Sequence, residues 1–422
     1  MRRLLLRTVV VAASAVLLGG CFAWPVPDQG PDRRSANTVE EDLRADNVAT
    51  LHAAFTVPLP GAPKGMVFGS DGLVVASGVD DPDFAGVQLR AVDPATGAVR
   101  WTSDTTYGFD AVYGEPILDT GARQIRYGFG ERFENVDDWR DLILDSRTGA
   151  YADSEPTDGA TVTQRGPAIV RFNRNAVWDV FDDDGWIVGE GQGGWVSVTG
   201  RALDGAVWVD PPPTDPPPTE PDDPEPTVGT DHLWLAHGRA LMGYRLDTAC
   251  PDRPQDGVCT AAWVRTLDGR PTRVVVGDDG VIHVATDGGT LYALDGPTGG
   301  VLWSTELGDG ALTKPALAGG RLYVVGASRT FAIDAITGDV LWRSTATTGA
   351  PTASPVVAGD VVYSATAATG VLRAYETAGC ESDECAPRWT ATAGSPVSHL
   401  LVASGRLYGL TANALVAYQP AA

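Results

Sequence analysis

The stretch LYALDGPTGGVLW, residues 291–303, returns about forty positions later as TFAIDAITGDVLW, residues 330–342. Both carry the pattern Ala-x-Asp-x-x-x-Gly-x-x-x-Trp, and a third intact copy ends at Trp101. The segments before the Asp and around the Trp are rich in β-branched and aromatic residues, which favours short strands. The Asp-to-Gly segment predicts a turn between them, because glycine accepts backbone conformations that other residues resist. The chain is therefore expected to repeat one β unit.

A second marker counts the units. A proline followed by an apolar segment recurs at intervals of about 40 to 60 residues, a period typical of propeller blades. These prolines are Pro63, Pro116, Pro167, Pro226, Pro271, Pro315, Pro355 and Pro396. Four short antiparallel strands in a unit of this length form one blade of a β-propeller. The spacing predicts an all-β, eight-bladed β-propeller of four-stranded antiparallel blades, with seven blades as the alternative.

The last unit lacks its fourth strand, and the N-terminus supplies one. After Pro396 there are three strand-like segments, and the matching fourth, LHAAFTVPLPG at residues 51–61, precedes Pro63. We expect this N-terminal strand to close the last blade, because pairing it there removes an open sheet edge.

A tryptophan at a fixed place in each unit offers a large apolar surface for packing one blade on the next. The three intact copies end at Trp101, Trp303 and Trp342. We expect these three side chains to be largely buried between adjacent blades, where they would dock one blade on another.

The repeats resemble the PQQ-binding-like β-propeller repeat family, in which a tryptophan-docking motif joins adjacent blades. The resemblance covers about residues 50–420 and weakens in the second unit, where Asp153 stands in place of the tryptophan. Dehydrogenases of this family bind pyrroloquinoline quinone (PQQ) on the propeller axis and commonly carry an adjacent Cys-Cys pair, which this sequence lacks. The resemblance to the propeller lipoprotein of outer-membrane assembly implies a scaffold instead, and bound PQQ is not expected.

The N-terminus has the layout of a secretory signal. Arginines at the start precede an apolar run from Val9 to Leu18, and Leu18-Gly19-Gly20-Cys21 resembles the bacterial lipobox, whose cysteine is acylated. The alternatives are an ordinary signal peptide or an uncleaved anchor. We expect a lipoprotein signal peptide over residues 1–20, lipidation of Cys21, a tether with a short helix over 21–48, and the propeller over 49–422. The helix is expected to begin at a capping box at Thr38.

The composition limits the partners and the compartment. The net charge is −23, with 54 acidic against 31 basic side chains, and so acidic a surface repels nucleic acid. Cys250 and Cys259 enclose one short loop, and Cys380 and Cys385 enclose another. The second cysteine of each pair lies four residues before a tryptophan. Two local disulfides suit an oxidising compartment, with a metal site as the alternative.

No catalytic, cofactor-binding or metal-ligating residue is predicted. The five histidines are scattered and no metalloprotease, serine-hydrolase or phosphate-loop motif is present. Acidic runs at residues 80–83 and 181–185 lack the alternating ligands of a calcium loop. Residues 210–226, DPPPTDPPPTEPDDPEP, are expected to form a solvated acidic insertion.

These features predict an extracytoplasmic lipoprotein, anchored to a bacterial cell membrane, that acts as a non-enzymatic scaffold or protein-interaction module for an envelope protein. The alternative is a divergent quinoprotein-like or glycan-active enzyme, or a ligand-binder, that uses the axial funnel.

Overall fold

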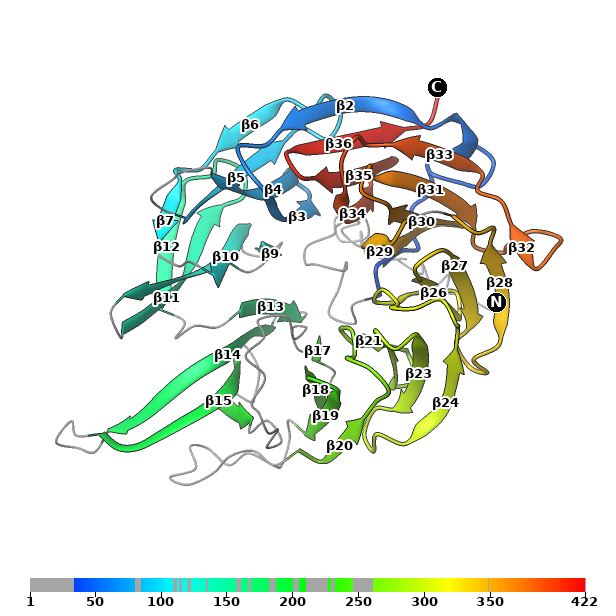
Figure 1. Ribbon diagram of the computed structural model, residues 1–422. Coiled ribbons are helices and arrows are strands. Elements are labelled where there is room, and N and C mark those ends of the chain that lie inside the picture. Colours follow the sequence, from blue (N-terminus) through cyan, green and yellow to red (C-terminus); the bar gives the residue numbers. More distant parts are fainter. Residues whose placement is uncertain are drawn as a thin grey trace, which may run out of the picture.

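The computed structural model describes residues 34–79, 85–108, 112–113, 116–119, 123–133, 136–156, 161–165, 168–181, 187–199, 205–209, 227–228, 232–245, 261–347 and 349–421. Residues 1–33, with Cys21, and the insertion at 210–226 lie outside them. The described residues form eight sheets of four or five strands and one short 3-10 helix. The sheets follow one another around a common centre (Figure 1). The prediction of an all-β chain of four-stranded antiparallel units is confirmed.

We number the sheets 1 to 8 in the order of the units. Sheet 1 contains β3 (Pro63–Gly69), β4 (Gly72–Val79), β5 (Ala85–Val92), β6 (Val99–Thr102) and β7 (Thr106–Gly108). Sheet 2 contains β8 (Val112–Tyr113), β9 (Ile117–Asp119), β10 (Gln124–Phe133), β11 (Val136–Asp145) and β12 (Tyr151–Pro156). Sheet 3 contains β13 (Thr161–Arg165), β14 (Ala168–Phe181), β15 (Ile187–Thr199) and β16 (Gly205–Val209). Sheet 4 contains β17 (Thr227–Val228), β18 (His232–His237), β19 (Ala240–Arg245) and β20 (Trp263–Thr266).

Sheets 5 to 8 contain the most regular copies of the repeated unit. Sheet 5 contains β21 (Val275–Val276), β22 (Val281–Ala285), β23 (Thr290–Asp295) and β24 (Val301–Glu306). Sheet 6 contains β25 (Ala316–Ala318), β26 (Arg321–Val325), β27 (Thr330–Asp334), β28 (Val340–Ser344) and β32 (Glu384–Cys385). Sheet 7 contains β1 (Ala36–Asn37), β29 (Pro351–Ala358), β30 (Val361–Thr366), β31 (Val371–Glu376) and β33 (Trp389–Thr392). Sheet 8 contains β2 (His52–Pro58), β34 (Val397–Ala403), β35 (Arg406–Thr411) and β36 (Ala414–Gln419).

Sheet 8 joins the two ends of the described chain. β2 is its outermost strand and runs antiparallel to β36, with His52 opposite Gln419 and Pro58 opposite Ala414. The pairing predicted for residues 51–61 is therefore present. Apolar side chains then connect this sheet to sheet 1, where Phe68 and Tyr408 have ring centroids 6.4 Å apart within one buried cluster.

Each sheet has two ends that differ in their connections. Because neighbouring strands are antiparallel, the turns between strands one and two and between strands three and four share one end of the sheet. We call this end the first-turn face. The turn between strands two and three lies at the other end, the second-turn face. Among the described residues, the longest hairpins are β10–β11 and β14–β15. Both end at the second-turn face.

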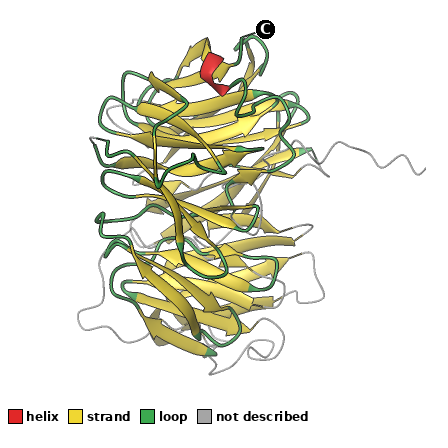
Figure 2. Ribbon diagram, turned by 90° about the vertical axis from the view of Figure 1, so that its right-hand side faces the viewer, coloured by secondary structure: helices red, strands yellow, loops and turns green. Residues whose placement is uncertain are grey.

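Residues 34–51, which we call the strap, do not form the predicted helix. They contain the two-residue strand β1 and the 3-10 helix η1 (Val48–Thr50) near the C-terminal end of the chain (Figure 2). The Glu40 carboxylate accepts the amides of Asp42 and Gly405, and the side-chain amide of Asn37 donates to Val402 O, 3.1 Å away. Tertiary contacts of Asn37 and Glu40 hold this segment in a non-helical conformation, and no helix precedes η1 in it, so the helix prediction is wrong.

Candidate functional site

The turn between the third and fourth strands is built in the same way in four sheets. In sheet 6, Asp334 Oδ1 accepts the amides of Ile336 and Thr337 at 2.9 Å, and the Gly338 amide donates to Asp334 O. Asp93, Asp145 and Asp295 make equivalent bonds in sheets 1, 2 and 5. The turn is therefore Asp-x-x-Thr-Gly, and the threonine, whose amide donates to the Asp in every copy, was missed in the sequence pattern.

The glycine of each turn receives an aromatic ring from the preceding sheet. Gly338 has φ +78°, and a Cβ on it would lie 2.7 Å from ring carbons of Trp303. Gly149 and Gly299 stand in the same relation to Trp101 and Trp263. A side chain larger than hydrogen has neither the backbone conformation nor the space at these positions. The glycine of the motif therefore serves two purposes: it permits the turn in its own sheet, and it leaves room for the tryptophan ring of the preceding sheet.

The indole N–H of each docking tryptophan donates to a backbone carbonyl of the next sheet. Trp303 donates to Ala335 O at 3.2 Å, and Trp342 donates to Thr377 O at 3.1 Å. The other such bonds join Trp101 to Ser146 O, Trp263 to Gly296 O and Trp389 to Leu51 O. A buried indole that is both packed and hydrogen-bonded fixes the position of one sheet against the next.

The three predicted docking residues differ in burial. Trp342 is 3% exposed, whereas Trp101 and Trp303 are of intermediate exposure and pack with one side on the next sheet. Three docking residues were not predicted: Trp263, Trp389 and Phe55, whose ring occupies the position under Gly97. The tryptophans after Cys259 and Cys385 were the available signal. For Phe55 the signal was its place in the N-terminal strand that completes sheet 8.

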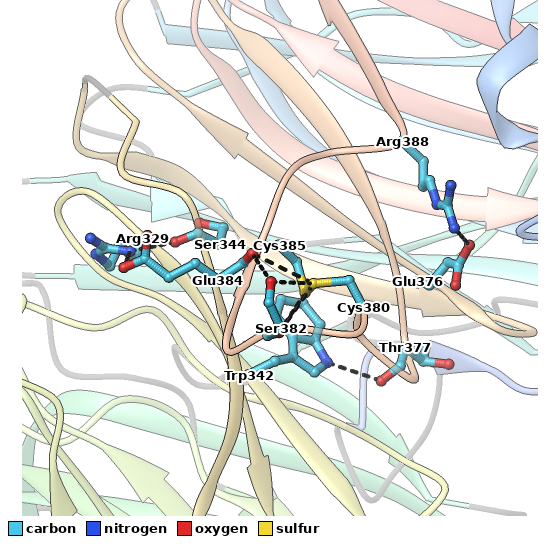
Figure 3. Close-up of a disulfide and its surroundings, with 10 residues drawn as sticks. All are labelled: Arg329, Trp342, Ser344, Glu376, Thr377, Cys380, Ser382, Glu384, Cys385 and Arg388. Carbon is cyan, nitrogen blue, oxygen red and sulfur yellow. Dashed lines mark hydrogen bonds and ion pairs between the residues drawn. A yellow bond between two sulfur atoms is a disulfide. The ribbon is translucent and has the colours of Figure 1, made fainter.

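The Cys380–Cys385 disulfide closes a loop that reaches back to the preceding sheet (Figure 3). Its Cα atoms are 5.6 Å apart. The loop supplies β32, which runs parallel to β28 along the outer edge of sheet 6. Arg343 N donates to Asp383 O, and Glu384 forms ion pairs with Arg329 and Arg343 at 2.9 and 3.2 Å. The loop thereby covers an exposed strand edge and joins sheets 6 and 7. Cys250 and Cys259 lie outside the described residues.

The strap lies along the inner edges of four consecutive sheets. Arg34 donates to Val276 O of sheet 5 at 3.0 Å, and its carbonyl accepts Leu317 N of sheet 6 at 2.8 Å. β1 pairs in parallel with β29, the innermost strand of sheet 7, with Ala36 opposite Val357 (Figure 1). The bond from Asn37 to Val402 O adds sheet 8. One short segment thus connects the axial edges of sheets 5 to 8.

Ionisable groups near these structures have altered acidity. The Arg100 guanidinium hydrogen-bonded to Asp93 lowers the pKa of that carboxyl to about 2. Burial lowers the pKa of His283 on β22 to about 4, and the nearby Asp279 opposes this shift. His283 is 2% exposed and its Nδ1 has no hydrogen-bond partner among the described residues. Because the folded protein disfavours the protonated imidazole, His283 lowers the free energy of unfolding at acidic pH.

No catalytic cluster emerges from the described part of the chain. Within it, no three His, Cys, Asp or Glu side chains gather in a way that would hold a metal ion. The buried polar groups Lys314 and Glu40 contact the strap itself or its neighbours: Lys314 Nζ donates to Ser35 Oγ at 2.7 Å. In the same residues, no helix has the length and apolarity needed to cross a membrane.

The repeated turn, the docking rings and the ring of sheets define a β-propeller of tryptophan-docked blades. A family model described as outer membrane protein assembly factor BamB matches residues 254–417. Within these residues the chain is similar to the PQQ-like β-propeller repeat family, and the match covers less than half of the chain. No curated protein sequence gives a significant match.

Solved structures show the same fold at low sequence identity. The crystal structure of BamB from Moraxella catarrhalis is 16% identical with a TM-score of 0.56, and the match covers 87% of this chain and 99% of that chain. A europium-containing methanol dehydrogenase is 11% identical with a TM-score of 0.61, over 94% and 98% of the two chains. A quinohemoprotein alcohol dehydrogenase from Pseudomonas putida HK5 is 11% identical with a TM-score of 0.63, over 95% and 80%. These likenesses concern the fold, since one fold hosts unrelated functions.

Proposed function

We propose that this chain is an extracytoplasmic lipoprotein, held at a bacterial membrane by an acylated Cys21, and that its propeller is a non-enzymatic scaffold for an envelope protein. We further propose that the eight sheets are the eight blades of a closed ring. Support for the ring comes from the count of eight sheets among the described residues and from the β2–β36 pairing. The match to a family described as an outer membrane protein assembly factor, and the fold shared with BamB, support the scaffold.

The strap is the observation that favours a scaffold over an axial enzyme. A quinone on the propeller axis would need room beside the inner strands, and the strap takes up the inner edges of sheets 5 to 8. Its polar groups are satisfied there by backbone partners such as Val276 O and Leu317 N. A ligand that displaced it would have to replace those hydrogen bonds, at about 1 kcal/mol each.

The second candidate is a divergent quinoprotein-like or glycan-active enzyme, or a ligand-binder, in the axial funnel. The two dehydrogenases with the same fold favour the quinoprotein form of it. Melting curves with and without PQQ and calcium separate the candidates, because a ligand that binds only the folded protein raises its melting temperature, and the rise grows with the logarithm of the ligand concentration above Kd. The scaffold predicts unchanged curves; a concentration-dependent rise with PQQ would support the enzyme.

The anchor is tested by fractionation. In a host that acylates lipoproteins, the protein should incorporate a labelled fatty acid and sediment with membranes. The Cys21→Ala variant should be released, or remain as an unprocessed precursor. Membrane retention of that variant at the mature size would contradict the anchor.

The scaffold role is tested by photo-crosslinking in intact cells. A photoreactive residue in place of Leu302 or Val264, which are 56% and 52% exposed on the outer strands β24 and β20, should give one adduct with an envelope protein. The same residue at the buried Leu322 serves as the control that should give none. Identical background adducts at all three positions would argue against a specific partner on these outer strands.

A further inference from the structure

We infer that the strap sets the orientation of the propeller at the membrane, with the first-turn face toward the lipid and the second-turn face away from it. The inference rests on the proposed anchor at Cys21. It adds the surface that meets the lipid, which the anchor alone does not specify, because a long flexible tether would let the propeller tumble.

The strap fixes the point from which the tether leaves the folded body. The most N-terminal described residue, Arg34, binds Val276 O and forms a 2.6 Å ion pair with Asp278, in the first turn of sheet 5. Its carbonyl binds Leu317 N, two residues before the first turn of sheet 6. The tether therefore starts near the axis, close to the first-turn face.

The rest of the strap continues across the same face. Asn37 O accepts Gly359 N, and the Ala45 amide donates to Asp360 Oδ1, both in the first turn of sheet 7. The carboxylate of Glu40 accepts Gly405 N in the first turn of sheet 8. The chain then enters β2 at His52, opposite Gln419, at the end of sheet 8 that carries these turns. Successive attachments to sheets 5, 6, 7 and 8 hold the strap as part of the rigid body rather than as a free linker.

The tether is short compared with the blade. Cys21 precedes Arg34 by 13 positions, so the two Cα atoms are at most about 45 Å apart when the chain is fully extended. A flexible chain of that length spans about 20 Å on average, and prolines such as Pro25 and Pro27 lengthen it. A path around the outside of a blade crosses four strands, about 15 Å, and then follows a strand for about 20 Å. Lipid against the second-turn face would therefore require a tether stretched over about 35 Å, far beyond the average span of about 20 Å.

The charge of the strap indicates that this face is held near the lipid without adhering to it. Glu41, Asp42 and Asp46 are exposed, with Arg44 as the only exposed basic side chain among residues 38–51. An acidic surface is repelled by anionic headgroups, over about a Debye length of 8 Å at physiological salt. The second-turn face, where the long hairpins β10–β11 and β14–β15 end, is left free to meet a partner that lies away from the bilayer.

The test uses the full, acylated chain on zwitterionic vesicles that contain a headgroup-quencher lipid. An azide-bearing phenylalanine replaces either Asp46, on the strap, or Ala412, in the β35–β36 turn at the second-turn face, and is coupled to a fluorophore. Both positions are exposed; Asp46 follows Ala45, which binds the first turn of sheet 7, and Ala412 lies in the adjacent sheet 8, so they differ mainly in the face that carries them. Because the two faces are about 20 Å apart, quenching at position 46 should exceed that at position 412 at least about twofold.

The outcomes separate the orientation from the anchor. Equal quenching at both positions, or stronger quenching at position 412, overturns the orientation while vesicle flotation still supports the anchor. Failure of the protein to float with vesicles overturns the anchor, and the orientation with it. A variant with a long Gly-Ser insertion after Gly30 should still float but lose the difference between the two positions, which shows that tether length sets it.

Discussion

Replacing Gly338 with alanine separates the two roles that the docking glycine combines. Gly338 has φ +78°, and Gly280 in the first turn of sheet 5 has φ +79°. A Cβ on Gly280 meets nothing within 4 Å, whereas one on Gly338 lies 2.7 Å from the ring of Trp303. The backbone strain of alanine is therefore the same at both sites, and only Gly338 adds a clash with the neighbouring sheet.

The magnitudes follow from these two effects. A left-handed alanine costs about 1 kcal/mol, and forcing a methyl group into a packed contact adds about 1 to 3 kcal/mol. Gly280→Ala should thus destabilise by about 1 kcal/mol and Gly338→Ala by about 2 to 4 kcal/mol. Urea denaturation followed by circular dichroism measures the difference between the two variants.

A double variant shows whether the ring is the cause. Trp303→Ala removes the ring that Gly338 touches, so adding Gly338→Ala to it should cost less than in the native background: the strain of about 1 kcal/mol and a close contact with Thr305 Oγ1 remain. Equal losses for Gly280→Ala and Gly338→Ala in the native background would refute the docking contact. So would an undiminished cost of Gly338→Ala in the absence of the ring.

Three further predictions follow from buried or cross-linked groups. Trp342→Ala should destabilise by about 3 to 5 kcal/mol, from lost burial and a cavity between sheets 6 and 7, and thermal melting measures it; a change below 1 kcal/mol would contradict the docking role. Replacing Cys380 and Cys385 with serine should cost about 2 kcal/mol, since the closed loop is short, and non-reducing peptide mapping should also link Cys250 to Cys259. Because burial lowers the pKa of His283 to about 4, its contribution to stability is complete above pH 6.5 and is lost as the pH falls toward 4, in total about 3 kcal/mol. His283→Leu should remove that part of the pH dependence in urea denaturation at a series of pH values, and an unchanged slope would disprove it.

The features that could be predicted from the sequence depend on residues close together in the chain. The Asp-to-Gly turn and its tryptophan lie within about ten residues of each other, and this spacing is enough to predict strands, turns and the repeat. The N-terminal strand of sheet 8 was predictable because a unit with three strands demands a fourth. Phe55 escaped the pattern because a different aromatic ring fills the same space under Gly97.

The strap could not be predicted, because its partners are distant in sequence. Arg34 binds Val276 across 242 residues, and Asn37 binds Val402 across 365. Locally, Thr38 to Glu41 fits a capping box, and the local rule gives a helix. Asn37 and Glu40, which flank or lie within this stretch, bond to Val402 and Gly405 of sheet 8, and these tertiary hydrogen bonds favour a non-helical conformation over the local propensity.

Both connections between the ends of the chain wait for the C-terminal sheet. β2 needs β36, and Asn37 needs Val402, so neither can form until nearly the whole chain is present. Contacts of such sequence separation form slowly, because their loop-closure entropy is lost before they add stability. Until then, β2 and the inner edge of β29 are unpaired strand edges, which are prone to pairing with other chains. Strap and closing strand stand next to each other in the sequence, and placing one of them brings the other within reach of its site. The first contact thereby lowers the entropic cost of the second, so we expect the pairing of β2 and the covering of the axial edges by the strap to be cooperative.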